Sequence, residues 1–143
     1  MGRIRRKLCH KNKKSIGNKG GKSMEIEFYV LGEVDEENLK FAVISTVYQG
    51  KWIYVKHKQR KSWEIPGGHR ETGESIENTA ERELFEETGA KIFNIKPVCD
   101  YSMNANEKLF GRLFFSEVSE IGDLPISEIS EIKLFDGLPE NLT

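Results

Sequence analysis

Residues 67–90 constrain the fold of this chain more than any other part of the sequence. They begin with two glycines and continue as a segment dense in glutamate, in which Glu83, Glu86 and Glu87 stand at positions i, i+3 and i+4. In an α-helix, residues at this spacing lie on one face, within an arc of about 100°. Carboxylates this close together repel one another and destabilise the helix. We therefore expect a cation to balance them, and a divalent metal ion is the obvious candidate.

The helix is predicted over about residues 75–89. Ser75 can cap the first turn with its hydroxyl group, and Gly89 stands where a left-handed residue ends a helix. Apolar or small side chains recur every four residues and form a stripe that can pack on a core. The stripe consists of Ile76, Ala80, Leu84 and Thr88.

Strand-like segments precede and follow this helix. Three come before it, at about residues 25–33, 41–48 and 51–58, and three come after it, at about 92–101, 109–118 and 130–135. The pair Gln49 and Gly50 is a hairpin signal between the second and third segments. The order β-β-β-α-β-β-β is neither a repeat nor a regular βαβ series. It favours an α/β fold with a mixed sheet covered by few helices.

The composition is typical of one soluble globular domain. The chain has 143 residues, of which 37% are hydrophobic, and no apolar run reaches the length of a membrane span. The basic N-terminus lacks the apolar segment of a secretory signal. The two cysteines, Cys9 and Cys99, form no CxxC pair, which argues against a disulfide or zinc framework. We therefore expect a cytoplasmic protein without a membrane partner.

The net charge of −1 hides an uneven distribution. Residues 1–23 hold nine Lys and Arg and no acid, so the remainder has 13 basic residues against 23 acidic ones. A domain with an excess of acidic residues is a poor general binder of nucleic acid. Such an excess is expected, however, in a protein that binds metal ions, because the charge count does not include the bound cations. The first 23 residues show no apolar periodicity, and such a segment cannot bury enough surface to order itself.

Residues 1–23 are therefore predicted to be a disordered basic tail, and residues 24–143 the working domain. The tail is either an arm for nucleic acid or an acidic partner, or an appendage that is not part of the working domain. The second interpretation is favoured. One version of this second interpretation is that the native protein starts at Met24, which begins the first strand-like segment.

The glutamate-rich helix supplies hard oxygen ligands, which suit Mg²⁺ or Mn²⁺ rather than zinc. Glu74, just before the helix, can lean into the same site, and Arg82 can pair with a carboxylate. The glycine turn at Gly67 and Gly68 permits close backbone approach, so a carbonyl group there could be a further ligand. Metal ions bound in this way polarise a phosphoryl oxygen, activate water and neutralise the leaving group.

These residues resemble the Nudix box, G-x5-E-x7-R-E-U-x-E-E-x-G-U, in which U is bulky or aliphatic. The pattern is filled by Gly68, Glu74, Arg82, Glu83, Leu84, Glu86, Glu87, Gly89 and Ala90. Ala90 is small where a larger aliphatic residue is usual, which affects packing rather than chemistry. The lead-in Trp-Glu-Ile-Pro at residues 63–66 also looks like that of the family. The resemblance implies an α/β/α sandwich around a mixed sheet, and attack of water on a phosphorus of a nucleoside diphosphate linked to another group.

The resemblance also implies a role for each box residue. Arg82 would orient the glutamates during catalysis, and Gly68 would offer its carbonyl oxygen to the metal. The other metal ligands implied are the catalytic residues Glu83, Glu86 and Glu87, with Glu74 as an additional or indirect ligand.

The general base varies among Nudix enzymes. It is either a glutamate of the box or one from a later loop, for which Glu128 and Glu131 are the candidates here, although both could equally be solvated charges. The basic run at residues 56–61 is either a solvated loop or a phosphate-binding patch, with Lys58 and Arg60 as its candidate phosphate ligands.

The lead-in and the short domain resemble the branch of the family that hydrolyses oxidised purine triphosphates such as 8-oxo-dGTP. An RNA 5′ end, a dinucleoside polyphosphate and a nucleotide sugar remain alternative substrates. A nucleotide-binding sensor without catalysis is the alternative from another class. Family members commonly carry a second helix after the last strand, so in a chain that stops at Thr143 we expect that helix to be very short, absent or cut off.

Overall fold

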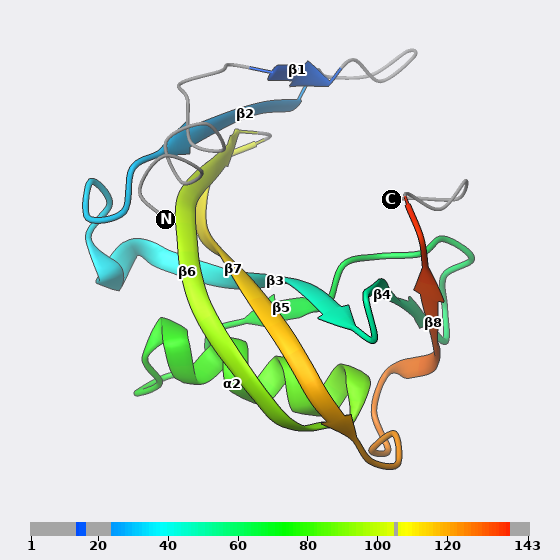
Figure 1. Cartoon of the computed structure of the whole chain (residues 1–143). Helices are drawn as coiled ribbons and strands as arrows, with labels where there is room; N and C mark the ends of the chain where they lie inside the picture. Colours follow the sequence, from blue (N-terminus) through cyan, green and yellow to red (C-terminus); the bar gives the residue numbers. More distant parts are fainter. Residues whose placement is uncertain (1–13, 17–23, 105, 138–143) are drawn as a thin grey trace.

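The structure, a computed structural model, describes residues 14–16, 24–104 and 106–137 (Figure 1). The described elements are eight strands, one short 3-10 helix and one α-helix. In chain order they are β1 (Lys14–Ile16), β2 (Met24–Tyr29), η1 (Glu36–Asn38), β3 (Leu39–Tyr48), β4 (Lys51–His57), β5 (Gly67–His69), α2 (Ile76–Thr88), β6 (Ala90–Asn104), β7 (Lys108–Ile121) and β8 (Ile129–Phe135).

The strands form a mixed sheet. Its order is β1-β2-β6-β7-β3-β4-β8, and β5 pairs with β3 beside this path. Strands β3 and β7 are parallel, and the other pairs are antiparallel. The six predicted strands and the predicted mixed sheet are confirmed. The short strands β1 and β5 were not predicted, because each has only three residues and is recognisable only from its partner.

The predicted hairpin is present but short. Gln49 and Gly50 both have positive φ angles, 53° and 75°, as a two-residue hairpin turn requires. Only two residue pairs join β3 to β4. The other edge of β4 pairs with β8 along most of its length. Strand β5 pairs with an earlier part of β3, where Val43 faces Gly67. The predicted turn at Gly67 and Gly68 is therefore wrong: both glycines lie in strand β5 with ordinary φ angles, held next to the centre of the sheet by this pairing.

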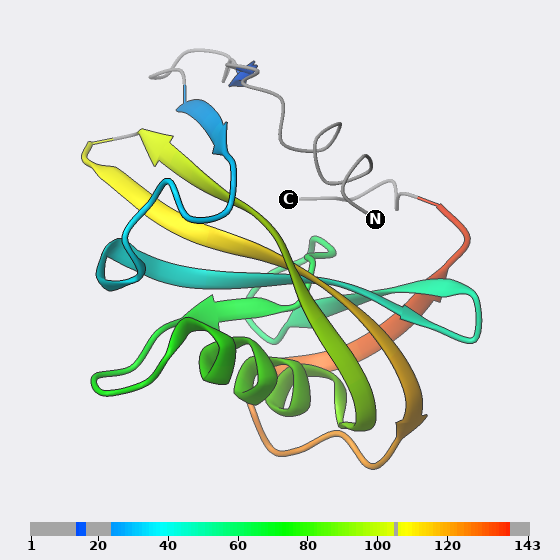
Figure 2. The ribbon, with the colours of Figure 1, turned by 60° about the vertical axis from the view of Figure 1, so that its left-hand side comes forward.

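Helix α2 is bounded as predicted. The Ser75 hydroxyl accepts a hydrogen bond from the Asn78 backbone N–H at 3.1 Å, and Gly89 is left-handed with φ 77°. Ile76, Ala80 and Leu84 are fully buried and pack the helix on β3 and β5, on one face of the sheet (Figure 2). The predicted apolar stripe is therefore confirmed. With this stripe packed on the core, the glutamates of the helix face Gly67 and Gly68 in β5.

The fold class is confirmed as α/β, with a mixed sheet and one main helix. Among the described residues, which reach Gly137 at their C-terminal end, α2 is the only α-helix. The second helix that the resemblance implied is therefore absent from this part of the chain, and residues 138–143 lie outside it. No helix in the described ranges is long and apolar enough to cross a membrane.

The boundary of the working domain stays a prediction. Residues 1–13 and 17–23 lie outside the described residues, whereas residues 14–16 form β1 and pair with β2 at the edge of the sheet. A disordered tail does not describe these three residues. Sequence reasoning missed them because they have no alternating pattern of their own.

We expect a variant that begins at Met24 to keep its fold. Of the described elements, this variant lacks only β1, a three-residue strand at the edge of the sheet. The free energy of unfolding in urea should therefore change by less than about 1 kcal/mol. Fluorescence-monitored urea unfolding of the full chain and the shortened chain checks this. A variant that no longer unfolds cooperatively would show that the first 23 residues belong to the domain.

Candidate active site

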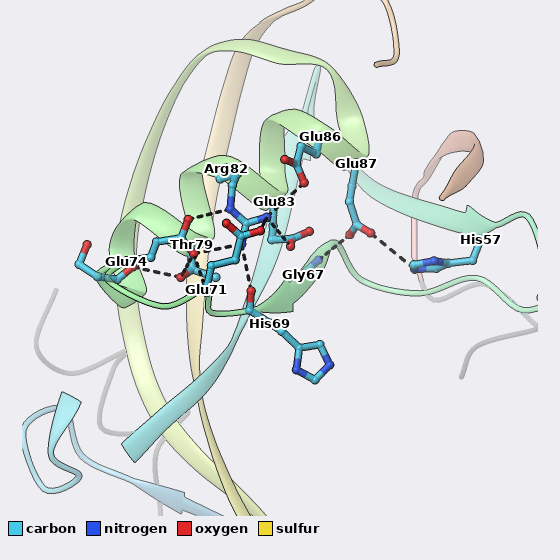
Figure 3. A network of polar contacts seen from close by, with 11 residues as sticks. His57, Gly67, His69, Glu71, Glu74, Thr79, Arg82, Glu83, Glu86 and Glu87 are labelled. Atoms are coloured by element: carbon cyan, nitrogen blue, oxygen red, sulfur yellow. Dashed lines mark hydrogen bonds and ion pairs between the residues drawn. The ribbon is translucent and has the colours of Figure 1, made fainter. Parts of the chain in front are cut away.

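Three glutamates of α2 share the face toward the two glycines of β5, as predicted, but their surroundings differ. The Glu87 side chain is only 7% exposed, whereas that of Glu86 is 45% exposed. The Glu83 side chain is largely buried beside Arg82. Figure 3 shows these carboxylates along one side of the helix, facing β5. One face of one helix therefore holds two largely buried carboxylates, Glu83 and Glu87, and one accessible carboxylate, Glu86.

Arg82 connects the glutamates to one another. Its Nε and Nη2 donate to the two oxygens of Glu74 at 2.7 and 3.0 Å, and its Nη1 donates to Glu83 and Glu86 at 2.9 and 3.2 Å. Nη2 also donates to the backbone carbonyl group of His69 in β5 at 2.9 Å. One guanidinium thus donates hydrogen bonds to three carboxylates and to the strand that carries the glycines, and a fourth carboxylate, that of Glu71, lies 3.8 Å from Nη1.

Glu74 is held firmly as an acceptor. Beside Arg82, it accepts hydrogen bonds from the Thr79 hydroxyl at 2.7 Å and from the Glu71 backbone N–H at 3.1 Å. These bonds, that from Arg82 above all, lower the pKa of Glu74 to about 2. Glu74 is therefore ionised and occupied by protein donors, which suits an indirect role better than direct metal contact.

Gly68 lies directly against the Glu83 carboxylate. A Cβ atom at position 68 would come within 2.3 Å of Glu83 Cδ, so any larger residue there would displace the Glu83 carboxylate from its present position. Burial raises the pKa of Glu83, although Arg82 opposes the shift. The predicted neighbourhood of Gly68 and Glu83 is present, and the use of the Gly68 carbonyl group as a metal ligand stays a prediction.

Glu87 faces the other end of β5. Its Oε1 accepts a hydrogen bond from the Gly67 backbone N–H at 2.8 Å, and its Oε2 lies 3.5 Å from Nε2 of His57. Burial raises the pKa of Glu87 to about 8, and the charges of Glu83 and Glu64 add to this effect. The charged form of Glu87 therefore lacks compensation by the protein.

The chemistry of this face fits a divalent cation. Its donors are carboxylate oxygens and a backbone carbonyl group, which Mg²⁺ and Mn²⁺ prefer. Burial is the main cause of the raised pKa values of Glu83 and Glu87, and a bound cation would stabilise the charged forms that burial disfavours. In the described part of the chain, no three acidic, histidine or cysteine side chains already converge on one metal position. Binding would therefore require rotation of side chains, for which Glu86 is exposed enough.

The other predicted residues lie at the rim of this face. A cavity of about 240 Å³ is lined by residues 57–60, which include Lys58 and Arg60, together with Ser127 and Glu128. The Glu128 side chain is 91% exposed and lies 3.9 Å from Nδ1 of His57. Glu131 is instead paired with Lys56 at 3.6 Å, on neighbouring strands. Of the two candidate bases, the structure therefore brings Glu128 toward the glutamates of α2.

Two residues of the site were not predicted, His57 and Glu64. Glu64 Oε2 is buried and lies 3.2 Å from Nε2 of His57, while its other oxygen accepts a hydrogen bond from Arg60. His57 was counted only as part of a basic run, and Glu64 only as part of the lead-in to the box. An isolated bridge between Val55 and Glu64 brings them together, and no local pattern in the sequence indicates this contact.

Comparisons with known proteins identify relatives of this chain. The family model described as the NUDIX domain matches residues 28–136. A Bacillus subtilis protein named "Putative 8-oxo-dGTP diphosphatase YtkD" is 34% identical over 98 residues, which are 67% of this chain and 61% of that protein. A Mus musculus protein named "Nucleoside diphosphate-linked moiety X motif 6" is 53% identical over 39 residues, which are 27% of this chain and 12% of that protein. The matched region thus spans less than two thirds of the length of either relative.

A solved structure gives a similar result. The Bacillus subtilis pyrophosphohydrolase BsRppH is 25% identical and aligns with a TM-score of 0.72, covering 82% of this chain and 75% of that one.

Proposed function

This chain belongs to the Nudix hydrolase family, and we propose that it hydrolyses the diphosphate linkage of a nucleoside diphosphate derivative with Mg²⁺ or Mn²⁺. The observation that carries the proposal is the face of α2, where three glutamates meet one arginine and the two glycines of β5, of which Gly67 leaves no room for a Cβ atom beside the Ala42 carbonyl group. Without a cation, this face carries more negative charge than Arg82 balances.

Glu83, Glu86 and Glu87 would hold the cation, with the carbonyl group of Gly68 as a further ligand. Glu74 would act indirectly, because its oxygens are already occupied by Arg82 and Thr79. The cation supplies charge neutralisation of the phosphates and lowers the pKa of a bound water. Arg82 keeps the glutamates oriented through its bonds to Glu83 and Glu86.

The rim residues are suited to the substrate rather than to the cation. Lys58 and Arg60 line the cavity beside the glutamates, where their charges can attract phosphate groups. Arg60 is already paired with Glu64, so Lys58 is the more available of the two. Glu128 is the candidate that can accept a proton from the attacking water, because it is exposed and lies near the site; a glutamate of the helix is the alternative.

We propose a nucleoside triphosphate of the 8-oxo-dGTP type as substrate, with water converting it to the monophosphate and pyrophosphate. The name and the 34% identity of the Bacillus subtilis relative support this choice. The cysteine usage, with no CxxC pair, supports a cytoplasmic setting for this reaction.

A second candidate substrate is a 5′-triphosphorylated RNA end or a dinucleoside polyphosphate. The similarity to a pyrophosphohydrolase structure and the open cavity with Lys58 and Arg60 at its rim favour it. A sensor without catalysis is less favoured, because all the carboxylates of the Nudix box are present.

A substrate panel tests the proposal. Purified protein with Mg²⁺ and 8-oxo-dGTP, dGTP, Ap4A or 5′-triphosphorylated RNA should release product from at least one, with 8-oxo-dGTP preferred over dGTP, because all four present the linkage that the α2 face is suited to cleave. Product formation is followed by chromatography, with EDTA as the control. No turnover on any member, together with measurable nucleotide binding, would favour the sensor instead.

A further inference from the structure

His57, at the end of β4, lies between two carboxylates of the site. Its Nε2 is 3.2 Å from Glu64 Oε2 and 3.5 Å from Glu87 Oε2, and its Nδ1 faces Glu128 at 3.9 Å. The imidazole is largely buried. Figure 3 shows it approaching Glu87 from the strand side, opposite the helix. Its position is therefore defined by acceptors from three separate segments of the chain.

Nε2 of His57 faces two carboxylate oxygens at once, at 3.2 Å from Glu64 and 3.5 Å from Glu87. A single N–H on Nε2 can donate to only one acceptor at a time. Glu64 Oε2 is buried and has no hydrogen-bond partner among the described residues, so the ring is the polar group placed beside both carboxylates.

Glu87 is consequently supported at both oxygens. The Gly67 backbone N–H donates to Oε1 at 2.8 Å, and the His57 ring stands next to Oε2. Such contacts fix the plane of a carboxylate that is nearly fully buried. Donors behind a metal-binding carboxylate orient it and change its affinity for the metal.

We propose that His57 is a positioning residue that orients Glu87 and Glu64 and thereby sets the affinity of the site for its divalent cation. This inference rests on the proposed function, since it takes Glu87 as a metal ligand. It adds that the end of β4 participates in the site, together with the face of α2.

Binding of Mn²⁺ to the nucleotide-free protein, measured by isothermal titration calorimetry, tests the inference apart from catalysis. His57→Leu keeps the bulk but removes the donor, and should weaken Mn²⁺ binding by about 10- to 100-fold. His57→Gln places an amide N–H near the position of Nε2 and should restore most of the affinity. His57→Asn places its amide nearer to Nδ1 and should behave like the leucine variant.

Activity separates orientation from general damage. At saturating Mg²⁺ the nucleotide KM of His57→Leu should change less than about threefold, while the Mg²⁺ concentration for half-maximal rate rises with the Mn²⁺ dissociation constant. His69→Gln is the matched control for Mn²⁺ binding, because its ring packs on Phe41 and points away from the carboxylates (Figure 3).

Each outcome bears on the inference. Unchanged Mn²⁺ affinity in folded His57→Leu overturns it, and so does a glutamine variant as weak as the asparagine variant. If the leucine variant does not fold, the comparison of glutamine with asparagine decides alone. A wild-type protein that neither binds Mn²⁺ nor hydrolyses any nucleotide overturns the proposed function and, with it, this inference.

Discussion

Glu87→Gln is expected to leave the protein folded and to reduce hydrolysis at saturating Mg²⁺ by at least about 100-fold. The side chain is buried, and Oε1 accepts a hydrogen bond from Gly67. The amide oxygen of glutamine can accept the same bond, and the side chain has the shape of the protonated acid. The fold is therefore kept, while one negative charge is lost from the proposed cation site.

The same variant should change the pH dependence of stability. Burial raises the pKa of Glu87 from 4.5 in the unfolded chain to about 8. Below pH 4.5 the group is neutral in both states. Between pH 4.5 and about 8 the unfolded chain has lost this proton while the folded protein keeps it, so the folded state is progressively destabilised as the pH rises, and the loss is complete above about pH 8. In EDTA, Glu87→Gln should therefore unfold at a higher temperature than the wild type at pH 9, by a margin that shrinks toward pH 5.

Addition of Mg²⁺ should reverse this order. A cation that binds only the folded state stabilises it, and the wild type should gain more than the variant. Thermal unfolding with EDTA and with Mg²⁺, together with initial rates, measures both effects. Glu81→Gln, an exposed glutamate on the same helix, is the matched control and should match the wild type. A Glu87→Gln protein with wild-type rates would contradict the assigned site.

The local parts of this structure were predictable from the sequence. The bounds of α2 follow from Ser75 and Gly89, whose capping chemistry lies within a few residues of the helix ends. The stripe that begins at Ile76 follows from helical periodicity, and the turn at Gln49 and Gly50 follows from the need for positive φ. In each case the physical cause is contained in a short segment.

The parts of the site that were missed depend on contacts between distant segments. Glu83, Glu86 and Glu87 were all expected to be metal ligands on one face, and the sequence did not indicate that β5 and His57 bury Glu87 and leave Glu86 half exposed. Strand β5 exists because β3 has a free edge beyond its short hairpin with β4. Periodicity reports which face of an element is apolar, but not which strand will lie against it.

Another pair of residues that the sequence did not indicate lies away from the site. Asp100 in β6 and Arg112 in β7 are directly opposite each other in the sheet. Arg112 donates to both oxygens of Asp100, from Nε at 2.6 Å and from Nη2 at 3.1 Å. Asp100 is 0% exposed, whereas the Arg112 side chain is 18% exposed. The carboxylate thus depends on its partner more than the guanidinium does.

Arg112→Met is expected to lower the free energy of unfolding by about 3–5 kcal/mol, because it leaves a buried carboxylate without its cation. Asp100→Asn should have a smaller effect, since Arg112 can reach water and the amide keeps one acceptor. The double variant should regain part of the loss of Arg112→Met, because no buried charge remains without a partner. Urea unfolding of the three proteins measures these differences.

Lys51→Met is the matched control, because it removes the cation from an exposed pair. Lys51 and Asp136 are 3.8 Å apart, and their side chains are 48% and 88% exposed, so the loss should stay below about 1 kcal/mol. Catalysis per folded molecule should be unchanged in all these variants, because neither pair contacts α2 glutamates in the described structure. Equal losses for Arg112→Met and Lys51→Met would show that burial of Asp100 does not control the strength of this interaction.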